Sequence, residues 1–248
     1  MNLTDAELDR YARHIVLPQV GGVGQRKLKE ASVAVIGAGG IGSAVIPALA
    51  GAGVGRLTII DSDVVELTNL HRQPLFRERD AGYSKSDLAL QFVHRLNHFV
   101  KATPVQERIG AENAPRLLAD HDLVIDGSDN FATRLAVSDT CAELGIPLLS
   151  AAAVQFQGQV GLFRSKPCYR CFVGDAFDAD DCDNCAELGV LGALTGTIGS
   201  FAGLVAINAL VGIGEGQAGK LHLFDGEKLE WRTIRIPADP HCKACGSA

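Results

Sequence analysis

The sequence predicts an α/β fold with a Rossmann-like, doubly wound and mostly parallel sheet that antiparallel strands extend. Three observations predict it. Short apolar runs alternate with helical patterns over residues 31–150, a glycine-rich turn follows the first run, and the pattern changes after residue 158. Strands that are apolar throughout are typical of a parallel sheet with helices on both faces.

The elements of residues 31–150 follow from local pattern. Predicted strands are short β-branched or apolar runs, and predicted helices carry apolar residues at helical spacing. The clearest stripe, Leu88, Phe92 and Leu96, predicts a helix with Ser84 as its N-cap. In chain order the sequence predicts strand 32–37, helix 40–53, strand 57–61, helix 84–100, strand 123–126, helix 130–144 and strand 147–151.

The second half of the chain has a different texture. Segment 167–187 is rich in Cys and Asp and shows no periodicity, and segment 188–214 carries no charge. Later, antiparallel strands are expected at 160–163, 220–224 and 231–236. Because no linker or repeat divides the chain, we expect one domain, 1–248, composed of a helical arm (4–30), a first half (31–150) and a second half (151–248).

The uncharged segment 188–214 is long enough to cross a bilayer. Gly199 and Gly203 form a Gly-x-x-x-Gly pair within it. However, Glu187 and Glu215 close its ends where basic anchors are usual, and Asn208 adds a polar amide. We therefore expect a helix buried inside the protein or between two subunits, and no membrane span.

Composition excludes several classes of protein. A hydrophobic fraction of 47% in 248 residues excludes intrinsic disorder, because such a chain can bury a sizeable core. With 23 basic and 29 acidic residues, the net charge of −6 disfavours a nucleic-acid or anionic-membrane binder. The N-terminal stretch is charged and has no apolar signal core, so a cytoplasmic protein is expected.

The turn Gly37–Gly42 matches Gly-x-Gly-x-x-Gly between a predicted strand and a predicted helix. Glycines such as Gly39, Gly40 and Gly42 allow a tight turn and close backbone approach, and a helix N-terminus favours phosphate oxygens. Asp61 ends the next strand, 19 residues after Gly42, where a carboxylate can bind ribose hydroxyls. The half 31–150 is therefore expected to bind a nucleotide. The motif alone does not separate NAD from ATP.

Other side chains favour ATP. Arg72 follows the ribose-binding strand and Lys85 starts the next predicted helix, so two cations lie near the phosphate end. They suit a polyphosphate more charged than the NAD pyrophosphate. Asp129 and Asn130 follow another strand, and carboxylates there are hard ligands for Mg²⁺. The alternatives are a solvated surface for Arg72 and Lys85, and a helix cap for Asp129.

Seven cysteines, an odd number, include three Cys-x-x-Cys pairs. The pairs Cys168/Cys171 and Cys242/Cys245 are separated by 70 residues and offer the four thiolates of a closed, structural zinc site. Redox dithiols are the alternative. The third pair, with Cys182 and Cys185, lies among aspartates, which raise a thiol pKa, but also where a mobile loop could carry a nucleophile. The seventh cysteine is expected in a helix core.

Together these motifs are recognisable. In order, GAGGIG, DSDVVELTNLHRQ, GYSK, DGSDN, CYRC and HCKAC resemble the MoeB/ThiF/HesA family, bacterial relatives of the ubiquitin-activating enzymes, over residues 10–246. The resemblance implies an adenylyltransferase that binds MgATP and the C-terminal Gly-Gly tail of a small ubiquitin-like sulfur-carrier protein. Such an enzyme transfers AMP to the terminal carboxylate and releases pyrophosphate. The adenylate then serves thiocarboxylate formation for molybdopterin, thiamin or thiolated tRNA.

The resemblance also assigns roles to residues of this chain. The glycine turn and Asp61 match the family's nucleotide loop and ribose carboxylate, and Asp129, paired with Asn130, matches its Mg²⁺-handling aspartate. Arg13 matches an arginine that reaches the partner subunit's ATP site, which implies a homodimer, and Cys185 matches the crossover-loop cysteine. The matches to phosphate-gripping residues are Asn69, Arg72 and Lys85. The matches to zinc ligands are Cys168, Cys171, Cys242 and Cys245.

Some questions stay open at this point. The half 151–248 is expected to hold the carrier and the zinc ion, and a separate sulfurtransferase would supply any later sulfur step. Cys182 has no family counterpart, and the carrier's pathway is not specified. Two rival functions are an NAD-dependent oxidoreductase on the same fold and a non-catalytic scaffold that binds a ubiquitin-like protein.

Overall fold

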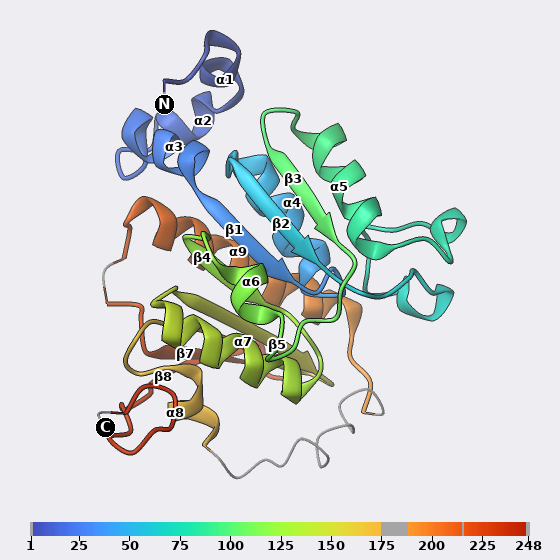
Figure 1. Cartoon of the computed structure of the whole chain (residues 1–248). Helices are drawn as coiled ribbons and strands as arrows, with labels where there is room; N and C mark the ends of the chain where they lie inside the picture. The colour runs from blue at the N-terminus through green and yellow to red at the C-terminus, as the bar shows by residue number, and fades with distance from the viewer. Residues whose placement is uncertain (1, 175–187, 215, 247–248) are drawn as a thin grey trace.

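The computed structural model describes residues 2–174, 188–214 and 216–246. Its centre is an eight-stranded sheet with the order β3-β2-β1-β4-β5-β6-β7-β8 (Figure 1). The first five strands in this order are parallel, and β6, β7 and β8 continue the sheet antiparallel. In chain order the strands are β1 Ser32–Ile36, β2 Arg56–Ile60, β3 Lys101–Val105, β4 Leu123–Asp126, β5 Leu148–Val154, β6 Gln157–Phe163, β7 Lys220–Asp225 and β8 Glu230–Arg235. The predicted fold class is confirmed.

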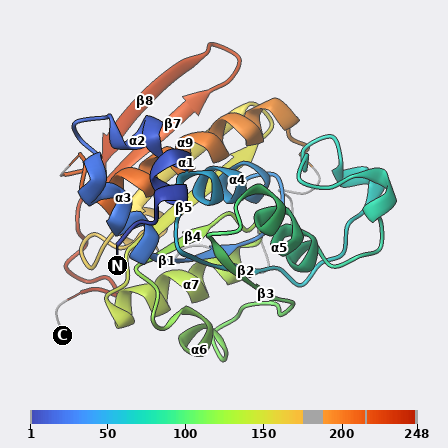
Figure 2. The ribbon, with the colours of Figure 1, turned by 90° about the horizontal axis from the view of Figure 1, so that it is seen from above.

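Helices cover both faces of this sheet (Figure 2). On one face α4, α5 and α9 share a core with half of the strand residues, and on the other face α6 and α7 pack on the alternate residues. The helices are α1 Asp5–Arg10, α2 Ala12–Ile15, α3 Gly21–Glu30, α4 Gly42–Ala52, α5 Lys85–Leu96, α6 Ala114–Leu118, α7 Phe131–Leu144, α8 Tyr169–Val173 and α9 Gly192–Val211, with 3₁₀ turns η1 Leu67–Asn69 and η2 Glu78–Asp80.

Strand β1 shows why the apolar runs are continuous. Val33 and Val35 point into the core under α4 and α9, whereas Ala34 and Ile36 point into the core under α6 and α7. All five residues of β1 are buried. Because both faces are covered, successive residues must all be apolar, and no alternation with polar residues develops.

Helix α9 is the uncharged segment. Within the described residues it is the one helix that is long and apolar enough to cross a membrane, and half of its most apolar window is buried in the fold. A Cβ on Gly199 would lie 2.6 Å from the carbonyl oxygen of Ile41, and one on Gly203 would lie 3.0 Å from Cβ of Ala48. The Gly-x-x-x-Gly pair therefore lets α9 pack closely on α4. This is one of the two arrangements that the sequence predicts.

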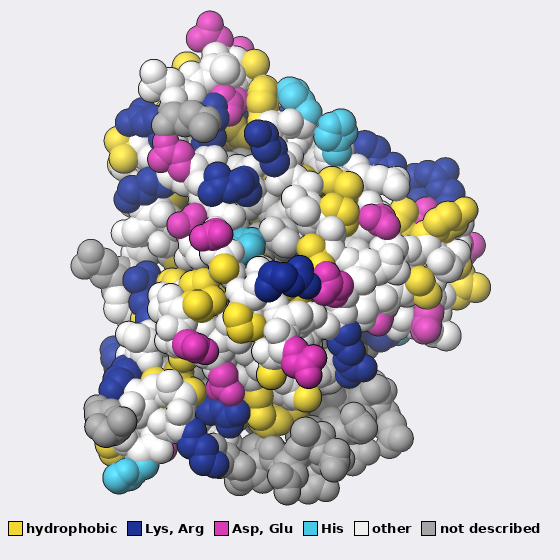
Figure 3. All heavy atoms as spheres, in the orientation of Figure 1, with side chains coloured by type: hydrophobic (Ala, Val, Ile, Leu, Met, Phe, Trp, Pro, Cys, Tyr) yellow, Lys and Arg dark blue, Asp and Glu magenta, His cyan; other side chains and the backbone are white. Residues whose placement is uncertain are grey.

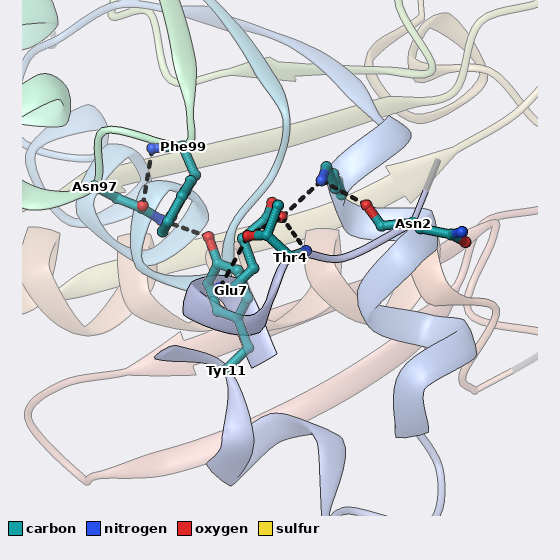
Figure 4. A network of polar contacts seen from close by, with 7 residues as sticks. Asn2, Thr4, Glu7, Tyr11, Asn97 and Phe99 are labelled. Carbon is teal, nitrogen blue, oxygen red and sulfur yellow. Dashed lines mark hydrogen bonds and ion pairs between the residues drawn. The ribbon is translucent and has the colours of Figure 1, made fainter. Parts of the chain in front are cut away.

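The N-terminal arm is attached to the central sheet by buried polar contacts (Figure 4). Glu7 is 3% exposed, and its Oε2 accepts hydrogen bonds from Nζ of Lys29 at 2.7 Å and from the backbone N–H of Thr4 at 2.8 Å. Nδ2 of Asn97 donates to the Tyr11 hydroxyl at 2.8 Å and to the carbonyl of Ala50 at 2.7 Å. The contacts of Glu7 hold the arm together, and those of Asn97 fix the arm to the C-terminal end of α4.

The sequence did not predict three of the elements. Strand β3 forms one edge of the sheet and contains Pro104, which has no N–H to donate and is tolerated at an edge. Helix α6 begins with a proline in its first turn, and α8 occupies part of the segment expected to be irregular. Each is only five residues long, too short for a periodicity to develop. Helix 84–100 was also predicted too long, since α5 ends at Leu96.

Candidate functional site

The glycine turn lies between β1 and α4, at the carboxyl edge of the parallel strands. Gly37 has φ +87°, which favours glycine, and a Cβ on Gly42 would lie 2.2 Å from the carbonyl oxygen of Gly37. Among the described residues no acceptor takes the backbone N–H groups of residues 39–42, including Gly39 and Gly40. Four unpaired donors at the start of an 11-residue helix form a site for an anion.

Asp61 follows β2 and lies beside this turn. One of its oxygens accepts the N–H of Ala38 at 2.7 Å, and the other accepts the N–H of Asp63 at 2.8 Å. Burial raises the pKa of Asp61, against the effect of these two N–H groups and of the Lys85 charge. Each carboxylate oxygen keeps a further lone pair for a ligand hydroxyl. The structure thus brings Asp61 and the glycine turn together.

Three of the predicted phosphate-binding residues follow β2 in the chain: Asn69, Arg72 and Lys85. Nη2 of Arg72 donates to Oδ1 of Asn69 at 2.6 Å, which fixes the guanidinium within its loop. Lys85 starts α5, is only 4% exposed, and its Nζ contacts the carboxylate of Asp63 at 3.0 Å. Ser84 caps the same helix as predicted, since its hydroxyl accepts the N–H of Asp87. The ammonium group of Lys85 is buried and has one carboxylate partner, Asp63, which is mostly exposed. Lys85 can therefore bind a further anion.

The segment 126–130 lies next to the glycine turn, because the N–H of Gly127 donates to the carbonyl of Ile36 at 3.0 Å. Asp129 is exposed and makes no side-chain hydrogen bond with the described residues. The alternative role of Asp129 as a helix cap is wrong, because Oδ1 of Asn130 caps α7 by accepting the N–H of Thr133 at 2.8 Å. Asp129 therefore remains available to a cation.

Arg134, which was not predicted as a site residue, holds segment 126–130 in place through its hydrogen bonds. Its guanidinium donates to the carbonyls of Ser128 and Ala151 and to the hydroxyl of Ser150. The charge of Asp126, which is 1% exposed, keeps the pKa of Arg134 above its ordinary value although burial opposes this. The signal available in the sequence was its position one helical turn after the Asn130 cap.

Several buried polar atoms at this edge have no partner. Among the described residues five side-chain oxygens are buried without a hydrogen bond, and three of them border the site: Oγ of Ser43, Oε1 of Gln73 and Oγ of Ser128. Buried polar groups are paired in most native structures, because leaving them unpaired is costly. These unpaired oxygens surround the unpaired N–H groups of the glycine turn. The arrangement fits a ligand that carries phosphate groups, with a hard cation bound to the free carboxylate of Asp129.

One predicted site residue of the described chain, Arg13, is not part of this edge. Arg13 is exposed on α2, and the arm that carries it is fixed at the C-terminal end of α4, while the glycine turn is at the other end (Figure 1). With 11 residues α4 is about 16 Å long, so Arg13 does not join the site of its own chain. Cys185, and with it Cys182, lies outside the described residues.

The four other paired cysteines come together. Their Sγ atoms all lie within 4.8 Å of one another, with Cys168 and Cys242 at 3.6 Å and Cys171 and Cys245 at 3.4 Å. Zinc–sulfur bonds of about 2.3 Å give a tetrahedron with sulfurs about 3.8 Å apart, so the cluster fits zinc and the distances exclude disulfides. Burial raises the pKa of Cys168 and Cys245. The cysteine of α7, Cys141, is buried in the core as expected.

A shallow cavity of about 550 Å³ lies beyond the C-terminal end of β5, between that strand and the start of α9. Gln155 and Phe156 line one side, and residues 188–191 line the other. The Lys and Arg side chains of the face in Figure 3 are mixed with Asp and Glu, and no basic stripe crosses it. The glycine turn and the cavity both lie beyond the carboxyl ends of parallel strands, β1 and β5.

Fold and site define a class: a Rossmann-like nucleotide-binding protein with an attached cluster of four thiols. The chain belongs to the ThiF family, whose model matches residues 11–244. It is 42% identical to the "sulfur carrier protein adenylyltransferase" of Thermus thermophilus, over 99% of this chain and 93% of that protein. It is 40% identical to the "SAMP-activating enzyme E1" of Haloferax volcanii, over 99% and 92%. The family resemblance is confirmed.

Longer relatives and solved structures give the same picture. The chain is 41% identical to "adenylyltransferase and sulfurtransferase MOCS3" of Anopheles gambiae, over 99% of this chain but 56% of that protein. A crystal structure of E. coli MccB with MccA-N7isoASN superposes with a TM-score of 0.85 at 22% identity, over 99% of this chain and 76% of that one. The structure of E. coli MccB with ATP gives a TM-score of 0.83 at 23% identity, over 96% and 75%. These structures share the fold.

Proposed function

We propose that this protein uses ATP to adenylylate the C-terminal glycine of a small ubiquitin-like sulfur-carrier protein. The observation that carries the proposal is the sheet edge itself: unpaired N–H groups at the glycine turn, Asp61, two cations and a free Asp129 carboxylate lie together. Relatives of nearly full length that are named for this activity support it. Molybdopterin or thiamin biosynthesis is the kind of pathway that the product would enter.

Each residue has a defined task in this reaction. The glycine turn and Asp61 hold the phosphates and ribose, and Asn69 holds Arg72 so that its guanidinium faces the triphosphate. Lys85 and Arg72 neutralise charge on the departing pyrophosphate. Asp129, beside Asn130, would hold Mg²⁺, which supplies further charge neutralisation on the phosphates. No general base is required, because a C-terminal carboxylate is already ionised near neutral pH.

The carrier is proposed to bind along the half 151–248. The cavity of about 550 Å³ between the end of β5 and the start of α9 is the place where a Gly-Gly tail would bind. Because Arg13 lies away from its own glycine turn, it would serve the site of a second copy in a cytoplasmic homodimer. The thiolate of Cys185 would attack the acyl adenylate, forming a thioester with the carrier and releasing AMP, and a separate sulfurtransferase would deliver the sulfur.

The test combines ligand choice and product. With ATP labelled at the α-phosphate, the label should appear on a carrier ending in Gly-Gly and not on one whose final glycine is deleted. Calorimetry should show binding of ATP in preference to NAD. Preference for NAD would establish the oxidoreductase alternative, and absence of label on every Gly-Gly carrier would favour a non-catalytic scaffold. Mass spectrometry of a Cys185→Ala variant with carrier and sulfur donor tests the covalent link.

The cysteine cluster is proposed to hold a structural zinc ion. The ion would tie the C-terminal segment to α8, since Cys168 is the N-cap of that helix and Cys171 lies within it, while Cys242 and Cys245 lie near the end of the chain. We expect about one zinc per chain by metal analysis and none in Cys242→Ser. Cys141→Ser is the matched control, because this buried cysteine lies in a different core and should leave the metal content unchanged. Wild-type protein without metal would contradict the assignment.

A further inference from the structure

The side chain of Gln73 lies beside the glycine turn and is not used by the proposed reaction. It is 4% exposed, and its Oε1 has no hydrogen-bond partner among the described residues. Its Nε2 lies 3.6 Å from the point where a Cβ on Gly39 would be. A buried amide thus lies beside Gly39 of the turn.

The backbone of Gln73 is held firmly. Its N–H donates to the carbonyl of Asn69 at 3.1 Å, and its carbonyl accepts the N–H of Phe76 at 3.1 Å. A Cβ on Gly192 would lie 2.1 Å from the carbonyl oxygen of His71, so the first turn of α9 presses on this loop. These contacts fix the backbone of Gln73, and among the described residues no side-chain hydrogen bond engages its amide.

We propose that Gln73 is a nucleotide-contacting residue, whose Nε2 donates a hydrogen bond to a phosphate oxygen bound at Gly39. Phosphate oxygens only accept hydrogen bonds, so the amide nitrogen is the group that serves them. A hydrogen bond to a charged acceptor is stronger than one between neutral groups. This inference rests on the proposed function, because it takes ATP as the ligand of the turn.

The chain offers a matched control in Gln25. Its side chain is completely buried, its Oε1 also lacks a partner, and its Nε2 donates to the carbonyl of Ala52 at 2.8 Å. Ala52 ends α4, so Gln25 lies at the end of that helix opposite the glycine turn. Both glutamines are buried and have an Oε1 without a partner among the described residues, but the amide nitrogen of Gln25 is already bonded and lies at the end of α4 opposite the proposed phosphate.

The experiment measures the dissociation constants of ATP, AMP and adenosine for the full chain and for Gln73→Glu, Gln73→Met and Gln25→Met. Both Gln73 variants should weaken ATP and AMP binding by about tenfold or more and leave adenosine binding within about twofold. Gln73→Glu should show the larger loss, because its carboxylate repels phosphate. Gln25→Met should lower the melting temperature and leave all three constants unchanged.

Two results would overturn the inference, and they are distinct from failure of the proposed function. Wild-type affinity for ATP in Gln73→Met would show that the amide makes no such contact. An equal loss for adenosine and ATP would show that the substitution disturbs the pocket as a whole. If the unaltered protein binds no ATP, the proposed function fails and this inference fails with it. Should Gln73→Glu not fold, Gln73→Met alone decides.

Discussion

Two groups of polar side chains lie at opposite ends of α4 and differ in how they are paired. At its C-terminal end, Glu7 binds Lys29 and Thr4, and Asn97 binds the Tyr11 hydroxyl (Figure 4). At its N-terminal end, oxygens of Ser43, Gln73 and Ser128 are buried without a partner. The first group completes its own hydrogen bonds, so its role is to attach the arm. The hydrogen bonds of the second group are incomplete among the described residues, which is typical of a site that binds a ligand.

The strongest test of this comparison is at the sheet edge. Asp129→Ala and Arg72→Ala should each reduce ATP–pyrophosphate exchange by about a thousandfold, because charge stabilisation in the transition state is lost. Both should unfold within about 0.5 kcal/mol of the unaltered protein in urea, since Asp129 is exposed and Arg72 bonds within its own loop. Glu112→Ala, an exposed carboxylate elsewhere, is the control. Normal exchange in either variant would remove that residue from the site.

A second prediction concerns the support beneath this edge. Arg134→Met should lower the free energy of unfolding by about 3 kcal/mol, because three acceptors lose their donor and the buried Asp126 loses its neighbouring cation. Arg116→Met is the control: its exposed pair with Glu107 should contribute less than about 1 kcal/mol. Equal stability of Arg134→Met and Arg116→Met in urea would show that the buried network does not hold the segment.

A third prediction uses pH at the arm. Burial tends to raise the pKa of Glu7, but the hydrogen bonds from Lys29 and Thr4 and the Lys29 charge outweigh it and hold the pKa below its ordinary value. A carboxyl with a depressed pKa stabilises the fold above its unfolded-state pKa and loses this contribution as pH falls through the folded-state pKa.

Glu7→Gln should therefore cost about 2 kcal/mol at pH 7, where the charged hydrogen bonds are complete. The difference from the unaltered protein should shrink steadily as the pH is lowered through the acid range in which Glu7 titrates. Urea unfolding at a series of pH values measures it, with Asp9→Asn, an exposed carboxyl of the same arm, as control. A difference that is independent of pH would mean that Glu7 does not act through its charge.

The local parts of this molecule could be predicted from sequence. The strands β1, β2 and β4, the glycine turn and the Ser84 cap depend on residues within a few positions of one another. The cysteine cluster could be predicted as well, because the Cys-x-x-Cys spacing already brings two sulfurs together. For the strands, the turn and the cap, the pattern and the structure arise from the same short stretch of chain; for the cluster this holds for each Cys-x-x-Cys pair.

What could not be predicted depends on contacts between distant residues. The Tyr11–Asn97 bond joins positions 86 apart, and Arg134 reaches carbonyls on two separate segments. Nothing local marks Gln73 as buried, since the loop of Arg72 and the start of α9 meet only in the fold. Strand β3 was missed because an edge strand with Lys101 and Pro104 lacks the apolar run of a central strand.

The smallest expected effect separates the two functions of the arm itself. Tyr11→Phe removes one hydrogen bond of Asn97 but keeps its bond to Ala50, so the free energy of unfolding should fall by about 1 kcal/mol while exchange activity stays unchanged. Arg13→Ala should do the reverse, since Arg13 is exposed and would act only in the partner's site. Tyr11→Phe could instead lose exchange activity in proportion to its loss of stability. In that case the attachment of the arm and the completion of the site would be one function, and the contrast between the two ends of α4 would fail.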